Sequence, residues 1–195
     1  MLSLLVLFTV HGAIATTEEG ACESRRQSLQ PLFETHYRTY NQEHYMSLWC
    51  VRNSENLYRA LRRDGLAEPS SSFAVYMIHS DADSSLFPRT ARYQTRRWSN
   101  HAFLVIDGFV LDQDFESAPR IVSLDSYLSS MWQGQTQQAI FQIRPADKIA
   151  GYTNYEVRES IRRGEYLVTD LTGLVLFFEP MSCSHAHRSG ENAEP

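Results

Sequence analysis

Two stretches in the first third of the chain carry apolar residues at helical spacing. Residues 28–45 show it loosely, and Pro31 predicts that any helix there begins at that proline or later. From residue 50 to residue 63 the periodicity is clearer, along a stripe formed by Cys50, Ser54, Leu57 and Leu61. Asp64-Gly65 ends this second helix, so Cys50 opens it and its sulfur faces the core.

A β-hairpin is the clearest structural prediction. The runs "HAFLVI" (101–106) and "FVLDQDF" (109–115) flank Asp107-Gly108, a dipeptide typical of the tight turns that join antiparallel strands. Residues whose numbers sum to about 215 then face each other across the hairpin. His101 and Asp112 are therefore expected nearly opposite each other, with Asp114 farther along the same face.

The remaining pattern completes an α+β fold. Runs of β-formers predict further strands at 73–78, 139–145 and 166–178, and shorter periodic segments predict helices around 124–131 and 155–162. Residues 80–97 are expected to form an irregular connection. A helix followed by an antiparallel sheet is an α+β arrangement, in which the helix packs on one face of the sheet.

Length and the character of the two ends predict one domain, residues 16–182. The chain has 195 residues, 43% of them hydrophobic, which is enough for one sizeable core. Residues 1–15 combine an apolar run with Ala13-Ile14-Ala15, the pattern of a cleaved signal peptide, so a secreted or periplasmic protein without stable membrane insertion is expected. No Lys or Arg precedes the run, which leaves a buried amino-terminal strand as the alternative. Residues 183–195 are polar and are expected to form a flexible tail.

Three cysteines are an odd number for an exported chain, so at least one thiol is unpaired within the monomer. Cys22 and Cys183 lie near the two ends of the mature chain, and chain ends are often close in space. A disulfide between them is therefore predicted, which leaves Cys50 as the thiol.

The thiol, one histidine and one carboxylate suggest nucleophilic catalysis. The unpaired N–H groups and the dipole at a helix N-terminus favour the thiolate form, and Cys50 is expected at such a position. A histidine within reach can take the thiol proton, while a carboxylate on the other ring nitrogen fixes the tautomer. His101 and Asp112 meet this demand, so the hairpin supplies a base and the residue that orients it.

Several short motifs occur in the order found in one enzyme family. They are Cys-x-x-Asn-x-x-x-Leu at Cys50, Asn53 and Leu57, "FAVY" at 73–76, Trp-x-x-His at Trp98 and His101, Asp-x-Asp at Asp112 and Asp114, and "FQIRPAD" at 141–147. Together they resemble protein N-terminal glutamine amidohydrolase, a papain-like and transglutaminase-like cysteine enzyme. The resemblance covers roughly residues 45–150.

The resemblance implies a glutamine deamidase. It implies a papain-like or transglutaminase-like fold and a catalytic triad of Cys50, His101 and Asp112. The thiol would attack the side-chain amide of a glutamine, N-terminal or internal, in a protein or peptide substrate. Ammonia would be released and a thioester formed, which water then cleaves. The supporting or substrate-binding residues would be Asn53, Trp98 and Asp114. Val51-Arg52 and Ser99-Asn100 depart from the family pattern, which leaves substrate choice open, and an exported chain is closer to secreted bacterial deamidases that modify internal glutamine.

Other functions remain in competition. A transglutaminase shares the acyl-enzyme and lets an amine replace water, a cysteine protease would accept backbone amides, and a secreted binding module would hold Cys50 as an inert core thiol. The "CSHAH" sequence at 183–187 is too short a spacing in a tail to predict a metal site, and no cofactor is expected. A net charge of -5 argues against a nucleic-acid partner, and we expect a monomer.

Overall fold

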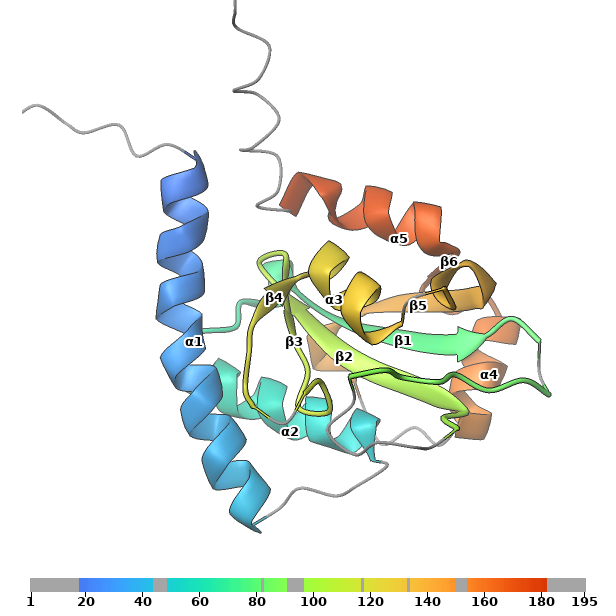
Figure 1. The fold of residues 1–195 in the computed structure, drawn as a ribbon, viewed down its shortest axis with the longest axis horizontal. Helices are drawn as coiled ribbons and strands as arrows, with labels where there is room; N and C mark the ends of the chain where they lie inside the picture. Colours follow the sequence, from blue (N-terminus) through green and yellow to red (C-terminus); the bar gives the residue numbers. More distant parts are fainter. Residues whose placement is uncertain are drawn as a thin grey trace, which may run out of the picture.

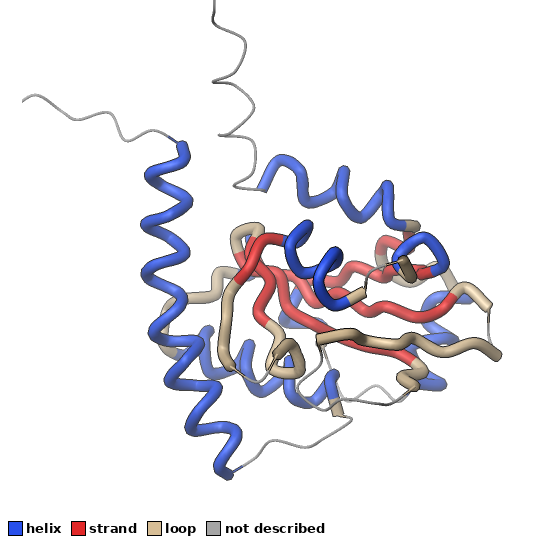
Figure 2. The backbone as a smooth tube through the Cα atoms, in the orientation of Figure 1, coloured by secondary structure: helices blue, strands red, loops and turns tan. Residues whose placement is uncertain are grey.

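The protein is built around one antiparallel sheet with helices on both faces (Figures 1 and 2). The computed structural model describes residues 18–43, 49–81, 83–90, 97–116, 118–132, 134–149 and 154–181. The strands lie in the order β4-β3-β2-β1-β5-β6. They are β1 (Ser72–His79), β2 (Asn100–Ile106), β3 (Phe109–Leu111), β4 (Val122–Ser123), β5 (Ala139–Pro145) and β6 (Leu167–Thr169). The helices of the described residues are α1 (Glu18–Glu43), α2 (Cys50–Arg63), α3 (Leu124–Met131), α4 (Asn154–Arg162) and α5 (Leu171–Phe178).

The two faces of the sheet carry separate cores. On one face, α1, α2 and α4 bury side chains such as Phe33, Leu61 and Val157. On the other face, α3 and α5 bury side chains such as Tyr127 and Phe178. The sequence predicted an α+β fold with a helix on one face, and the second layer of helices was not foreseen. A sheet covered on both sides explains why its central strands are continuous apolar runs rather than alternating ones.

The hairpin and α2 agree with the sequence prediction. Asp107 and Gly108 have φ values of 49° and 79°, and a two-residue hairpin turn of type I′ requires positive φ at both positions. Leu104 pairs with Leu111, whose numbers sum to 215. The second strand is shorter than predicted, because β3 ends at Leu111 and the chain then turns. The strands at 73–78 and 139–145 and the helices near 124–131 and 155–162 are also present.

The first helix corrects the prediction made from Pro31. α1 runs from Glu18 to Glu43 and contains Pro31 in its interior. A proline there removes one backbone donor and crowds the preceding turn, at a cost of about 3 kcal/mol. Leu29 and Phe33 on either side are fully buried, and the Arg25 side chain donates to the Leu66 carbonyl at 2.8 Å. Tertiary packing therefore holds the helix together through the proline.

The long strand predicted at 166–178 is wrong. Only Leu167–Thr169 forms a strand, and the apolar residues that follow form α5. Asp170 begins the helix, because its carboxylate accepts the N–H of Gly173 at 2.9 Å. A short apolar run does not distinguish a buried strand from a buried helix, and this N-capping aspartate was the signal that was missed.

The two ends of the chain are only partly described. The predicted signal peptide (1–15), Cys183 and the tail (183–195) lie outside the described residues. Cys22, on α1, is disulfide-bonded, whereas Cys50 is a free cysteine. The pairing of Cys22 with Cys183 stays a prediction. Among the helices of the described ranges, none combines the length and the apolar character needed to cross a bilayer.

Candidate active site

His101 and Asp112 form a buried hydrogen-bonded pair. His101 Nε2 lies 2.8 Å from Asp112 Oδ2, and the two residues are 0% and 3% exposed. The hairpin register would put Asp114 opposite His101, but the chain leaves β3 after Leu111 and turns, so Asp112 is the carboxylate that meets the ring. The backbone N–H of Asp114 instead donates to Asp112 Oδ1 at 2.8 Å. Asp114 thus orients the carboxylate rather than the imidazole.

Cys50 stands at the first position of α2. Its N-cap residue, Trp49, makes no side-chain capping bond, and the first backbone bond of the helix is from the Asn53 N–H to the Trp49 carbonyl, at 2.9 Å. The N–H groups of residues 50–52 therefore have no acceptor within the helix. Cys50 is half-buried and packs against the core on the α2 side. A nucleophile placed here has backbone donors beside it.

The thiol of Cys50 reaches the imidazole. An electrostatic interaction connects the side chain of Cys50 with the His101 ring. Since Nε2 is taken by Asp112, the nitrogen left for the thiol is Nδ1, which is buried and has no partner at regular hydrogen-bond geometry. The thiol thus interacts with the ring without a hydrogen bond of regular geometry to Nδ1. Contacts between a nucleophile and its base are often loose before substrate binds.

The ionisation of His101 reflects a balance of opposing effects. Burial disfavours the charged ring and would lower the pKa of His101. The charge and the hydrogen bond of Asp112, together with the interaction with Cys50, outweigh burial and hold the pKa of His101 well above its ordinary value. The site therefore favours an imidazolium.

The imidazole and the sulfur come from opposite faces of the sheet. Met77, the β1 partner of His101, belongs to the core under α3 and α5, whereas α2 packs on the other face. Within β2, residues 104–106 are the ones that pair with β3. Among the described residues, the first part of β2 therefore has no neighbouring strand on the β3 side. The sulfur and the ring can meet at this uncovered flank.

Aromatic rings surround the imidazole. The centroid of the Trp98 ring lies 4.8 Å from that of His101, and those of Trp132 and Phe103 lie 5.5 Å and 6.1 Å away. Trp98, predicted as a supporting residue, thus covers the ring directly. Asn53, predicted in the same role, is 1% exposed on α2, one turn after Cys50.

Tyr127 is a site residue that the sequence analysis missed. Its hydroxyl donates to Asp112 Oδ2 at 2.7 Å, the same oxygen that bonds His101. Burial and the charge of Asp112 raise the pKa of Tyr127 well above its ordinary value, so the hydroxyl stays a donor. A tyrosine on the buried face of a helix usually needs a partner for its hydroxyl, which was the available signal.

Ser54 is a second residue that the analysis did not assign to the site. It was predicted only as part of the buried stripe of α2. Its hydroxyl donates to the carbonyl of Ala102 at 3.1 Å, next to His101 in sequence. The bond attaches the first turns of α2 to the start of β2, and it therefore fixes the helix that carries the nucleophile relative to the base.

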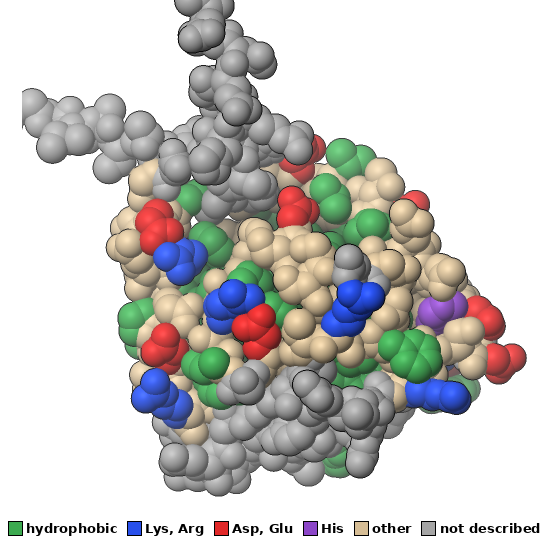
Figure 3. All heavy atoms as spheres, in the orientation of Figure 1, with side chains coloured by type: hydrophobic (Ala, Val, Ile, Leu, Met, Phe, Trp, Pro, Cys, Tyr) green, Lys and Arg blue, Asp and Glu red, His purple; other side chains and the backbone are tan. Residues whose placement is uncertain are grey.

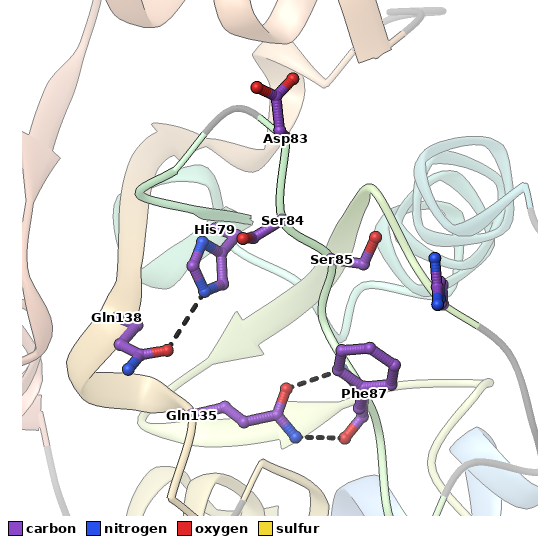
Figure 4. A pocket seen from close by; sticks show the side chains of 8 residues that line it. His79, Asp83, Ser84, Ser85, Phe87, Gln135 and Gln138 are labelled. Carbon is purple, nitrogen blue, oxygen red and sulfur yellow. Dashed lines mark hydrogen bonds between the residues drawn. The ribbon is translucent and has the colours of Figure 1, made fainter.

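A polar hollow of about 390 Å³ lies beside the end of β1, where His79 forms part of its lining (Figure 4). Its lining includes His79, Phe87, Arg97, Gln135 and Gln138. The described residues contain no group of three or more His, Cys, Asp or Glu side chains placed to hold a metal. On the face seen in Figure 3, basic and acidic side chains are intermixed and do not form a continuous basic patch.

Comparison with known proteins adds no family assignment. No protein-family model matches the sequence, and a search of curated proteins finds no match.

Proposed function

We propose that the protein is a cysteine-dependent amidohydrolase that converts a glutamine side chain of a protein or peptide to glutamate. The observation that carries the proposal is a buried imidazole that has Asp112 on Nε2 at 2.8 Å and interacts with the cysteine that opens α2. The motifs that resemble N-terminal glutamine amidohydrolase support this substrate class, and with it a papain-like or transglutaminase-like fold.

In the first half-reaction, the Cys50 sulfur attacks the carbonyl carbon of the γ-carboxamide. The C–N bond breaks, and the leaving nitrogen takes a proton from His101 Nδ1 and departs as ammonia. The Asp112 carboxylate orients the ring and stabilises the imidazolium. The product of this step is a thioester between Cys50 and the substrate.

In the second half-reaction, water replaces ammonia. His101 Nδ1 accepts a proton as the water oxygen attacks the thioester carbon, and collapse of the intermediate returns the proton to the Cys50 sulfur. The net reaction consumes one water and yields glutamate and ammonia. In both steps negative charge develops on the carbonyl oxygen, and the N–H groups of residues 50–52, which have no acceptor within α2, can donate to it.

The test is release of ammonia from peptides that contain one glutamine, either N-terminal or internal. Wild-type protein should release ammonia and form a peptide heavier by about 1 Da, and Cys50→Ala should be slower by at least about 1000-fold because the nucleophile is gone. Matched peptides with asparagine in place of glutamine control for background hydrolysis.

Two results would contradict the proposal. One is release of ammonia that Cys50→Ala leaves unchanged, and the other is no release from any glutamine peptide by folded wild-type protein. The same reactions with added cadaverine test for a transglutaminase, since incorporation of the amine at the glutamine would replace hydrolysis. Cleavage of the peptide backbone would indicate a protease.

A further inference from the structure

The hollow beside Trp98 lies next to the candidate catalytic residues. Met77 of β1 pairs with His101 of β2, and His79, two residues farther along β1, lines the hollow. Two residues span about 7 Å along a strand. Arg97, also in the lining, is followed directly by Trp98, whose ring is 4.8 Å from the imidazole. The hollow and the base therefore lie about two residues apart along the same pair of strands.

One wall of the hollow is a fixed, strand-like edge. Leu86 and Trp98 exchange two backbone hydrogen bonds, at 2.8 and 2.9 Å. In a strand the neighbouring residues, Ser85 and Phe87, present their N–H and C=O groups in the opposite direction. At Phe87 both groups are taken by the carboxamide of Gln135, which accepts the N–H at 2.7 Å and donates to the carbonyl (Figure 4).

The same edge is open at Ser85, two residues before Phe87. Among the described residues, neither backbone group of Ser85 has a hydrogen-bond partner, and Ser85 lines the hollow. An extended peptide can pair with an open strand edge of this kind, and the bonds between Gln135 and Phe87 show that the edge accepts an amide from the hollow's side. The volume of about 390 Å³ is at the small end for a binding site and suits a short segment.

The charge of the hollow favours an acidic side chain. Arg97 is exposed, and within the described part of the chain no carboxylate pairs with it. Asp83 also lines the hollow, but its carboxylate points away from the other labelled side chains in Figure 4. Of the other polar groups, His79 accepts the N–H of Asp81 on Nδ1 at 3.0 Å, and its Nε2 faces Gln138 Oε1 at 3.2 Å. Arg97 is therefore the cationic group that the lining offers to a ligand.

We propose that this hollow is a substrate subsite that binds an extended segment of the target protein, pairs it with the Ser85 edge and places an acidic side chain on Arg97. The identity of the neighbouring target residue as glutamine rests on the function proposed above. The offset of about 7 Å along the strand puts the acidic residue two or three positions from that glutamine. The enzyme would thus select glutamines in acidic extended segments.

The binding test uses the Cys50→Ala protein, which needs no turnover. Two fluorescent peptides share one internal glutamine and carry either glutamate or lysine at two and three positions on each side. The glutamate peptide should bind about threefold to fivefold more tightly, in the range of an exposed ion pair, and Arg97→Glu should reverse the preference. Arg63→Glu, with the same charge change at the far end of α2, is the matched control and should leave the preference unchanged.

A second series tests the strand edge. N-methylation of single backbone amides in the glutamate peptide should weaken binding at one position and leave its neighbours unaffected, because only one donor faces Ser85. Equal binding of the two peptides, or equal effects of Arg97→Glu and Arg63→Glu, would overturn the subsite. If the preference is found but wild-type protein releases no ammonia, the subsite stands and the proposed deamidation fails.

Discussion

At the scale of single residues, Asp112 holds the candidate site together. Its Oδ2 receives both His101 and Tyr127, and its Oδ1 receives the N–H of Asp114. Three donors from three segments fix one carboxylate, so its position does not depend on the hairpin alone. A carboxylate held in this way can orient the imidazole without rearrangement during the reaction.

Loss of the Tyr127 hydroxyl should lower the rate of the chemical step. Tyr127→Phe removes one donor to a charged acceptor, and we expect kcat for ammonia release to fall about tenfold with little change in KM. Tyr58→Phe is the matched control, because the Tyr58 hydroxyl is also buried and has no hydrogen bond among the described residues. Equal effects of the two variants, or a change in KM alone, would contradict a positioning role for Tyr127.

The residues of the pair were predictable from the sequence, and their support was not. Asp107-Gly108 fixes a two-residue turn, and the turn sets the register that brings His101 near Asp112. Tyr127 reaches Asp112 only because α3 packs across that face of the sheet. Such a long-range contact leaves no periodic signal in the sequence.

At the scale of secondary-structure elements, the predictions succeeded where a local signal ended the element. α2 ends at Arg63, followed by Asp64 and by Gly65 at a φ of 72°, as its sequence predicts. The apolar run at 166–178 was predicted as a strand, because Asp170 is the one residue in it that signals a helix boundary. α1 continues through Pro31 because buried side chains on both sides hold it.

Replacement of Pro31 should therefore stabilise the protein. Pro31 is exposed, so Pro31→Ala restores a helical N–H without loss of core packing, and we expect the free energy of unfolding to rise by about 1 to 3 kcal/mol. Urea unfolding monitored by circular dichroism, with the disulfide of Cys22 kept oxidised, measures the change. An unchanged or lower value would mean that the bend at Pro31 is itself needed for packing.

At the scale of the whole molecule, the site depends on both layers of helices. α2 supplies the thiol from one face of the sheet. On the other face, α3 supplies Tyr127, and Trp132 follows directly after this helix. The sheet between them presents His101 at the flank that β3 leaves uncovered. An α+β fold with one helical layer, as the sequence suggested, would have supplied the thiol but not the support of the carboxylate.

This arrangement makes the stability of the fold depend on pH. The pKa of His101 is raised well above its ordinary value of 6.5, so the folded protein binds a proton that the unfolded chain releases. The stabilisation is fully present below about pH 6.5 and is lost as pH rises through the folded-state pKa, with a slope of up to about 1.4 kcal/mol per pH unit.

The measurement is the free energy of unfolding from pH 5 to pH 9, below the titration of tyrosines, for wild type and His101→Gln. The difference between the two should shrink as pH rises above 6.5, and Asp112→Asn should remove the same dependence because it removes the main charge that raises the pKa of His101. A difference that is constant over this range would mean that the ring is neutral in the folded protein.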